Sequence, residues 1–331
     1  MKNIPFVLKL VIGILLSIAA FAVALSLGAA DISLRDIWNA LFSSQTNEDI
    51  LIIRENRLPR EVGAFFVGAA LAVAGAIMQG MTRNPLADPG LLGLTAGANA
   101  ALAAAIAFIP QANYIVIIIA CFIGAAVGAG LVFGIGSLRL GGLSPVKVVL
   151  AGAAVSALLY AVSEAIGLSF KLSKQVSAWT AGGLVGVNWT QLKLVIPIIL
   201  AGIILSLFLS HQLTLLSLSD EVAVGLGQKT FAIKALLFLV TILLAGASVA
   251  LVGNMTFIGL MIPHIVRFFA GTDYRYILPL SFFAGGTFML LADTAARTIN
   301  APYETPLVAI VAALGLPFFL FIVHRGGRAY S

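Results

Sequence analysis

Long apolar runs separated by short polar segments make up most of this chain. A helix that crosses the hydrocarbon core of a bilayer needs about 20 mostly apolar residues, and on that scale the sequence predicts about ten spanning helices. The predicted spans are 7–28, 57–81, 93–109, 114–138, 144–167, 191–209, 231–252, 256–269, 276–297 and 306–324. We expect an all-α polytopic membrane protein whose residues 1–331 form a single transmembrane domain. Several spans are short, so tilted or re-entrant pieces stay open as an alternative for them.

The segment 79–93 interrupts this pattern between the apolar runs 62–78 and 94–109, and it contains two prolines and three glycines. A continuous helix cannot pass through it, because proline lacks a backbone donor and clashes with the preceding turn. Irregular polar backbone at membrane depth is tolerated where it is buried in protein or lines a water-filled path. The segment therefore indicates transport.

Composition supports a membrane protein. The 331 residues are 61% hydrophobic and 10% charged, whereas soluble domains carry about 25% charged residues. Lys2 and the sequence Gly28-Ala29-Ala30 resemble parts of a signal peptide. The apolar run 4–27 is longer than the usual core of about 7–15 residues, so we expect a retained span.

Charge distribution predicts the orientation. An even number of spans places both termini on one side, and basic residues favour cytoplasmic loops. With both termini in the cytoplasm, eleven of the 19 lysines and arginines lie inside and eight outside. Arg83 and Asp88 of the interrupted segment then lie at the cytoplasmic end. The pI of 9.6 is explained by these loops, so no nucleic-acid partner is expected.

Signals of enzymatic chemistry are absent from the sequence. The single cysteine, Cys121, excludes an intrachain disulfide, and no Cys/His set has the spacing of metal ligands. There is neither a Walker lysine in a glycine-rich loop nor a nucleophile elbow. We expect no enzyme activity and no cofactor on this chain, and an ATP-driven mechanism would need a separate chain.

Arg54, Arg57 and Arg60 gather at the outer mouth of the span 57–81. Arginine forks suit bidentate pairing with carboxylates, which favours a docking site for an acidic partner. The alternative is that these long side chains extend to the membrane interface. Asp293 and Arg297 stand at i and i+4, where they can pair along a helix. Arg297 would lie near the other arginines if the two helices pack together.

The longest polar segment on the inner side is 210–229. Ser219 can cap a helix that has Asp220 and Glu221 in its first turn and ends at Gly227. A short helix across the cytoplasmic face is suited to contact another subunit. A plain connecting loop is the alternative.

Other positions leave two readings open. Glu164 either lines an outer vestibule or is solvated at the interface, because an acid at mid-bilayer would cost about 2.5–3.5 kcal/mol. His264 follows the kinking Pro263 and either relays protons or is satisfied by a neighbour. Six glycines form two stripes that would let helices approach closely. They are Gly63, Gly68 and Gly75, and Gly124, Gly128 and Gly130.

Six motifs occur in order along the chain. They are Arg57-Leu58-Pro59-Arg60; 75–79 leading to Arg83-Asn84-Pro85-Leu86-Ala87-Asp88-Pro89; Ala223 with Leu226 and Gly227; 257–260 with Pro263, His264 and Arg267; Asp293 with Ala296 and Arg297; and Gly315-Leu316-Pro317-Phe318-Phe319. With these motifs the chain resembles, over nearly its whole length, the permease subunits of the iron-siderophore and cobalamin ABC importer family.

The resemblance implies a fold like that of the cobalamin importer permease, with ten helices and a second permease subunit sharing the pore. It also implies two cytoplasmic ATPase subunits, which bind ATP and Mg, and an extracytoplasmic substrate-binding protein. The site residues that it implies are Arg57, Arg60 and Arg297 for docking of the binding protein; Asn84, Leu86, Ser144 and Pro145 for the cytoplasmic gate; and Asp220, Glu221, Ala223, Leu226 and Gly227 for ATPase coupling.

Two departures from the family pattern stand out. Ala309 occupies the place of a glycine that usually follows Glu304 and a proline, and Pro145 and Val146 replace small hydroxyl residues of the cobalamin member. The second departure disfavours cobalamin. We therefore expect a permease that imports a ferric siderophore across a bacterial cell membrane by ATP-driven alternating access. The alternatives are a permease for cobalamin or haem, an ion-coupled secondary transporter, and a membrane anchor or sensor subunit.

Overall fold

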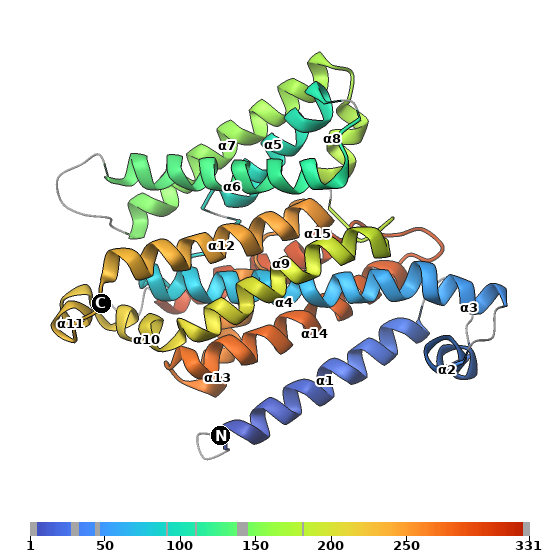
Figure 1. Ribbon diagram of the computed structural model, residues 1–331, viewed down its shortest axis with the longest axis horizontal. Coiled ribbons are helices and arrows are strands. Elements are labelled where there is room, and N and C mark those ends of the chain that lie inside the picture. The colour runs from blue at the N-terminus through green and yellow to red at the C-terminus, as the bar shows by residue number, and fades with distance from the viewer. Residues whose placement is uncertain are drawn as a thin grey trace.

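The computed structural model describes residues 5–27, 33–43, 47–90, 92–109, 111–137, 145–180 and 182–326, and all of the regular elements in these ranges are helices (Figure 1). Each predicted span coincides with one helix. These helices are α1 (Phe6–Ser26), α4 (Leu58–Thr82), α5 (Leu94–Phe108), α6 (Tyr114–Ser137), α7 (Pro145–Ser169), α9 (Trp189–Phe208), α12 (Thr230–Val252), α13 (Ile258–Ala270), α14 (Tyr274–Thr298) and α15 (Leu307–Gly326).

Seven helices in the described ranges are long and apolar enough to cross a membrane. Three apolar helices are shorter, namely Leu94–Phe108, Ile258–Ala270 and Leu307–Ile322. The all-helical membrane fold is therefore confirmed, and seven candidate spans are established. The expected count of ten depends on these three shorter helices.

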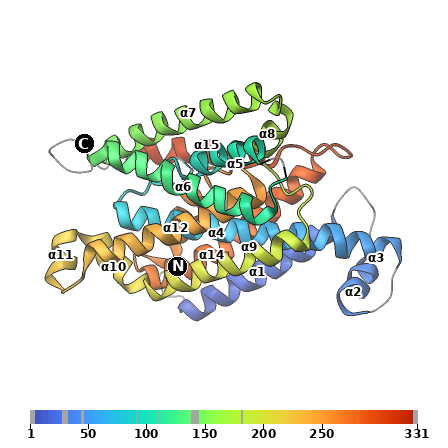
Figure 2. The ribbon, with the colours of Figure 1, turned by 45° about the horizontal axis from the view of Figure 1, so that its top comes forward.

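Short helices occupy the two ends of the bundle. At one end, here called the η1 end, lie α2 (Leu34–Phe42), α3 (Glu48–Ile52), the π-helix η1 (Ile53–Arg57) and α8 (Ser173–Thr180). At the opposite end, here called the α11 end, lie α10 (Ser210–Leu218) and α11 (Asp220–Gly225) (Figure 1). The long helices run between these ends, with α5–α8 forming a group on one side of α12 (Figures 1 and 2).

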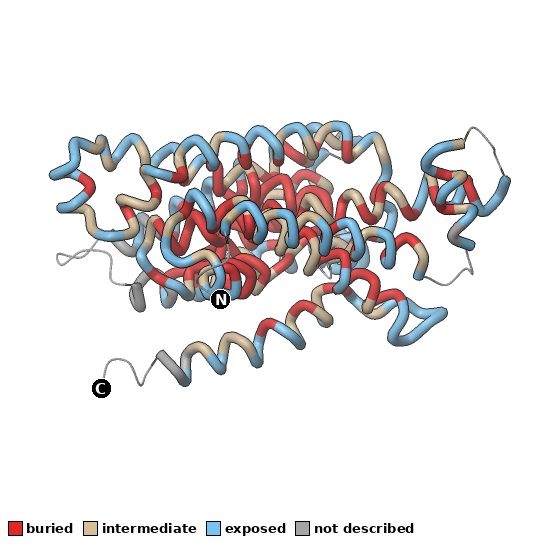
Figure 3. The backbone as a smooth tube through the Cα atoms, turned by 90° about the horizontal axis from the view of Figure 1, so that it is seen from below, coloured by how far each residue is buried: buried red, intermediate tan, exposed pale blue. Residues whose placement is uncertain are grey.

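Helix α4 is the centre of the bundle, because it packs against α14, α12, α13 and α9. Buried residues concentrate along this central region, whereas α1 lies at the edge of the bundle in Figure 1 and α15 at the edge in Figure 3, and both helices have exposed apolar side chains. A central position requires that neighbouring helices come very close. Small residues on α4 make that approach possible.

Glycines form the closest helix contacts. A Cβ atom added to Gly75 would lie 2.0 Å from the carbonyl oxygen of Gly259 on α13, and one on Gly68 would lie 2.3 Å from that of Gly285 on α14. Gly124 and Gly128 pack equally closely on the start of α5. The predicted packing role is confirmed for these positions. It is wrong for Gly130, where a Cβ would meet no atom within 4 Å.

The first four residues of the interrupted segment, 79–82, still belong to α4, and the left-handed backbone of Arg83 (φ 53°) caps this helix. No helix passes through residues 83–90, as its prolines predict. The Asp88 carboxylate is buried and accepts a hydrogen bond from the Gly90 amide at 2.7 Å. The segment thus folds back into the protein beside Gly259. The Asp88 carboxylate is buried against the start of α13, and its expected place on the cytoplasmic side stays a prediction.

Substitution of Gly75 by alanine is expected to destabilise the protein strongly. Adding one methyl group to a close-packed contact typically costs about 1–3 kcal/mol, and here the obstacle is backbone rather than a movable side chain. The thermal unfolding midpoint of the purified chain in detergent measures the effect. Gly130→Ala is the matched control and is expected to leave the midpoint unchanged. Equal midpoints for the two variants would contradict the close contact.

Candidate functional site

A network of ion pairs joins two helices and the segment before α15 at the η1 end. The Arg60 guanidinium donates to Asp293, with distances of 2.9 Å from Nε to Oδ2 and 2.9 Å from Nη2 to Oδ1. The same group donates to Glu304, at 2.7 Å from Nη1 to Oε1 and 3.0 Å from Nη2 to Oε2. Arg60 therefore bridges α4, α14 and the segment before α15 through two bidentate contacts.

Arg297 lies on the other side of Asp293. Its Nε donates to Asp293 Oδ2 at 3.0 Å, which confirms the predicted i, i+4 pair. Its Nη2 forms an ion pair with Glu61 and donates to the carbonyl of Ala24 at 3.1 Å, and Nη1 donates to the carbonyl of Leu27 at 3.0 Å. The network therefore reaches the C-terminal end of α1.

Arg57 completes this end of α1 by donating from Nη1 to the carbonyl of Leu25 at 2.8 Å. The last carbonyls of a helix lack intrahelical partners and carry partial negative charge, so arginines stabilise them. Arg57 and Arg297 are only 7% and 8% exposed. They act here as fixed internal donors that hold the marginal helix α1 on the bundle.

The pair between Arg60 and Glu304 is the accessible part of the network, with side-chain exposures of 14% and 42%. The hydrogen bond from Arg60 lowers the pKa of Glu304 below its ordinary value. Glu61 lies within the network and is fully buried, and no role for it was predicted from the sequence. Its spacing of four residues from Arg57 was a usable signal, but burial could not be foreseen.

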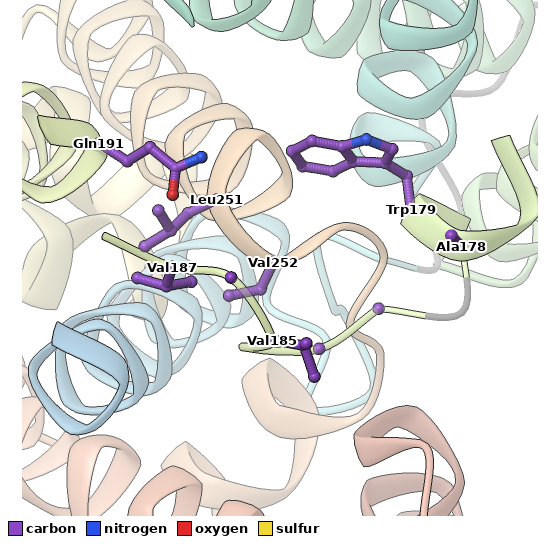
Figure 4. Close-up of a pocket in the computed structure, with 10 residues that line it drawn as sticks. Ala178, Trp179, Val185, Val187, Gln191, Leu251 and Val252 are labelled. Atoms are coloured by element: carbon purple, nitrogen blue, oxygen red, sulfur yellow. The ribbon is translucent and has the colours of Figure 1, made fainter. Parts of the chain in front are cut away.

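Two hollows open beside the network. One, of about 450 Å³, is lined at its charged side by Arg57, Arg60, Arg297 and Glu304. The other, of about 400 Å³, has Trp179 on one side and Gln191 on the other (Figure 4). They share the lining residues Val185, Gly186 and Val187. The η1 end therefore carries two adjacent hollows that share the wall 185–187, and the one beside Arg60 has a charged side.

A second candidate site lies at the α11 end. Ser219 caps α11 by accepting from the Val222 amide at 3.0 Å, and Gly227 follows the helix with a φ of 80°. The predicted short helix is thus confirmed. Within α11 the side chain of Ala223 is buried, whereas the side chains of Val224 and of the C-cap residue Leu226 are 58% and 62% exposed. An exposed apolar surface on a well-anchored helix is suited to contact another protein.

Asp220 connects this helix to the interrupted segment. It accepts from Lys234 Nζ at 2.8 Å, and Arg83 Nη2 lies 3.8 Å from its Oδ2. The hydrogen bond from Lys234 lowers the pKa of Asp220. Helix α10, which precedes α11, packs on α4 and α14. A displacement of α11 would therefore change the contacts at the end of α4.

Known proteins similar to this chain identify its family. The model of the FecCD transport family matches residues 15–325. The chain belongs to the FecCD transport family.

Several members of the family are similar over nearly the whole chain. The iron(3+)-hydroxamate import system permease protein FhuB of Bacillus subtilis (strain 168) is 45% identical over 324 residues, covering 97% of this chain and 84% of that protein. The ferric enterobactin transport system permease protein FepD of Escherichia coli (strain K12) is 37% identical, covering 95% and 94%. The hemin transport system permease protein HmuU of Yersinia pestis is 39% identical, covering 94% and 93%.

A solved structure has the same fold. A metal-chelate type ABC transporter in an inward-facing conformation superimposes with a TM-score of 0.81 at 27% identity, covering 97% of this chain and 99% of that one. The predicted importer permease of the siderophore family is thereby confirmed, and the chain is an integral membrane protein. Among the described residues, no group of three or more His, Cys, Asp or Glu side chains is placed to hold a metal ion.

The family motifs meet in space. Arg60 pairs with Asp293, Gly75 packs on Gly259, and a Cβ on Gly315 would lie 2.4 Å from Cβ of Phe257. These contacts join residues that are 58 to 233 positions apart in the chain. Close approach and charge pairing explain the motifs as contacts of the folded bundle.

The remaining predicted site residues are dispersed. Asn84 is buried and its Oδ1 accepts from the Leu86 amide at 3.0 Å, so these two residues, which are predicted to belong to the gate, form one turn. Ser144 lies outside the described residues, as does the side chain of Pro145, which begins α7. Glu164 lies on an exposed face of α7, away from the charged network, and both of its interpretations stay predictions. His264 contacts the ring of Phe318, with centroids 5.7 Å apart.

Replacement of Asp293 by alanine is expected to destabilise the protein by about 3–5 kcal/mol, because Arg60 and Arg297 would lose the carboxylate that they share. Glu304→Ala removes a carboxylate from the same arginine at a solvent-exposed position, where a pair is worth up to about 1 kcal/mol. Unfolding midpoints of the two variants in one detergent provide the comparison. A larger loss for Glu304→Ala would contradict the central role of Asp293.

Proposed function

We propose that this chain is the permease subunit of a binding-protein-dependent ABC importer that carries a ferric siderophore into the bacterial cytoplasm by ATP-driven alternating access. The observation that carries the proposal is the similarity over nearly the full chain to permeases named for iron(3+)-hydroxamate, iron(3+)-citrate and ferric enterobactin import. Ferric hydroxamates are the first substrates to test, since the FhuB relative is 45% identical. Haem is the second candidate, on the similarity to HmuU. A permease for cobalamin has no counterpart among these relatives.

The two ends of the bundle receive different partners in this proposal. The η1 end faces the outside, where an extracytoplasmic binding protein releases its ligand into the hollow that Arg60 lines. The α11 end faces the cytoplasm, together with both termini. Ten membrane crossings and one transmembrane domain over residues 1–331 belong to the same proposal, supported by the ten helices at the predicted positions.

Energy enters through α10 and α11. Two ATPase subunits, which carry ATP and Mg, contact the exposed surface around Leu226. The proposal is supported by the chain of contacts from α11 through Asp220 to Arg83 at the end of α4. Motion of α11 would thereby act on the adjoining turn, which contains Asn84 and Leu86. In this proposal that turn, together with Ser144 and Pro145, forms the cytoplasmic gate, which the motion opens. Glu164 is proposed to line the pathway.

A second permease subunit would complete the pore. Within the described ranges, helix α15 packs mainly on α13 and α14, and its side chains Leu314, Leu316, Leu320 and Phe321 are half exposed or more. Figure 3 shows α15 at the margin of the bundle. This face and the exposed apolar face of α7 offer a surface to a second copy or a related chain.

The proposal is tested by deleting the gene for this chain in its own bacterium and measuring uptake of radioactive iron bound to a hydroxamate siderophore. We expect the deletion to abolish uptake of the hydroxamate-bound iron and the intact gene to restore it, while haem uptake is unchanged. Loss of haem uptake alone would instead support the second candidate. Uptake by the purified chain alone in liposomes, driven by a proton gradient, would contradict an ABC importer.

Docking on Arg60 makes a sharper prediction, because Glu304 already occupies this guanidinium. A carboxylate of the binding protein must displace Glu304, so Glu304→Gln is expected to strengthen docking several-fold and Arg60→Gln to weaken it. The dissociation constant of the binding protein for the assembled transporter in nanodiscs is the measurement. Glu55→Gln is the control, since Glu55 lines the same hollow without pairing with Arg60. Unchanged affinity in both test variants would exclude Arg60 from docking.

A further inference from the structure

Helix α2 has three faces of different character. Ile37 and Ala40 are buried in a small apolar cluster with residues of α1, α3 and η1. Asp36 is partly exposed and lies on a polar face, on the side away from Trp38. Trp38 and Phe42 form a third face and are 65% and 69% exposed. Neither the ion-pair network nor the contact surface for ATPases explains this exposed aromatic face.

The third face is an extended apolar patch, to which Leu41 contributes as well, with 45% exposure. The rings of Trp38 and Phe42 lie against each other with centroids 4.5 Å apart. The spacing i, i+3 and i+4 places all three side chains on one side of the helix. Exposed patches with large aromatic side chains mark contact with a partner or a membrane.

The fold holds α2 firmly in place. The Arg54 side chain donates to the carbonyls of Ala40 at 2.8 Å and Asn39 at 3.2 Å, and also to that of Ser43. At the other end, Ser33 caps the helix by accepting from the Asp36 amide at 3.2 Å. A positive group at the C-terminus and a cap at the N-terminus each stabilise a short helix. The aromatic face is therefore presented by an anchored element.

The position of α2 beside α1 indicates that its exposed aromatic face contacts lipid. Helix α1 has long exposed apolar side chains along its length, as expected of a surface that faces lipid. Helix α2 lies just beyond the C-terminal end of α1 at the margin of the bundle, and Figure 1 shows it end-on while α1 runs across the view. Its axis thus crosses the direction of the spans. No residue of α2 lines either of the two hollows.

We propose that α2 is an interfacial helix, which embeds Trp38, Leu41 and Phe42 in the headgroup region of the bilayer next to the end of α1. Tryptophan and other amphipathic aromatic residues favour this region, and a helix in the membrane plane with one apolar and one charged face binds there. The apolar patch continues the lipid-facing surface of α1, while Asp36 on the opposite side of α2 faces the water. Through Arg54 this anchor also fixes η1 at the start of α4.

The test uses nitroxide labels on single cysteines in the full chain, reconstituted in nanodiscs of phosphatidylglycerol and phosphatidylcholine. The native Cys121 is fully buried, which favours selective labelling at the surface. Phe42→Cys and Leu41→Cys are the test positions, and Asp36→Cys on the opposite side of the same helix is the matched control. Accessibility is measured by electron paramagnetic resonance with oxygen, which concentrates in lipid, and a nickel chelate, which stays in water.

Labels at 41 and 42 are expected to be several-fold more accessible to oxygen than to the nickel chelate, relative to the label at 36. Two test positions guard against a local effect of one substitution. Nickel accessibility equal to that at 36 would overturn the proposal. It would also be overturned if the loaded binding protein, rather than lipid, immobilised the labels at 41 and 42, since the face would then be a docking surface for protein.

Discussion

Asp293 is the residue on which the η1 end depends, because one fully buried carboxylate serves two arginines from opposite sides. An ionised group out of water is costly unless other charges and donors compensate it. Here Arg60 and Arg297 provide these donors, and they are held in turn by Glu304 and Glu61. The spare donors of Arg297 satisfy the end of α1. One requirement, that no buried charge be left alone, thus fixes the relative position of α1, α4 and α14.

A second requirement operates in the middle of the bundle. Helix α4 can be central only because Gly68 and Gly75 let the backbones of α14 and α13 approach it. Close backbone contact in an apolar environment leaves carbonyls to be satisfied by specific donors, and Gln79 Nε2 donates to the carbonyls of Gly259 at 3.0 Å and Leu260 at 3.2 Å. Packing and hydrogen bonding therefore define a rigid axis from the η1 end to the α11 end.

This axis connects the two ends of the bundle at which a transport mechanism would require movement. At one end, the exposed pair of Arg60 and Glu304 is the part of the network that an incoming carboxylate can reach. At the other end, Asp220 joins α11 to the end of α4 through charges near the surface, which are weaker and more easily rearranged than the buried network. The strong contacts keep the bundle intact, and the weak contacts at its two ends are available for change.

The sequence by itself determined the membrane class, the positions of the ten helices and the break after Thr82, because these depend on local hydrophobicity and on proline chemistry. It also determined the cap at Ser219 and the pair of Asp293 with Arg297, which are contacts between near neighbours in the chain. Only the tertiary structure decided that Arg57 and Arg297 bind the carbonyls of α1, that Glu61 and Asp88 are buried, and that Arg54 holds α2. These contacts join residues far apart in sequence, and a pattern of residue types states which groups need partners but not which helices will supply them.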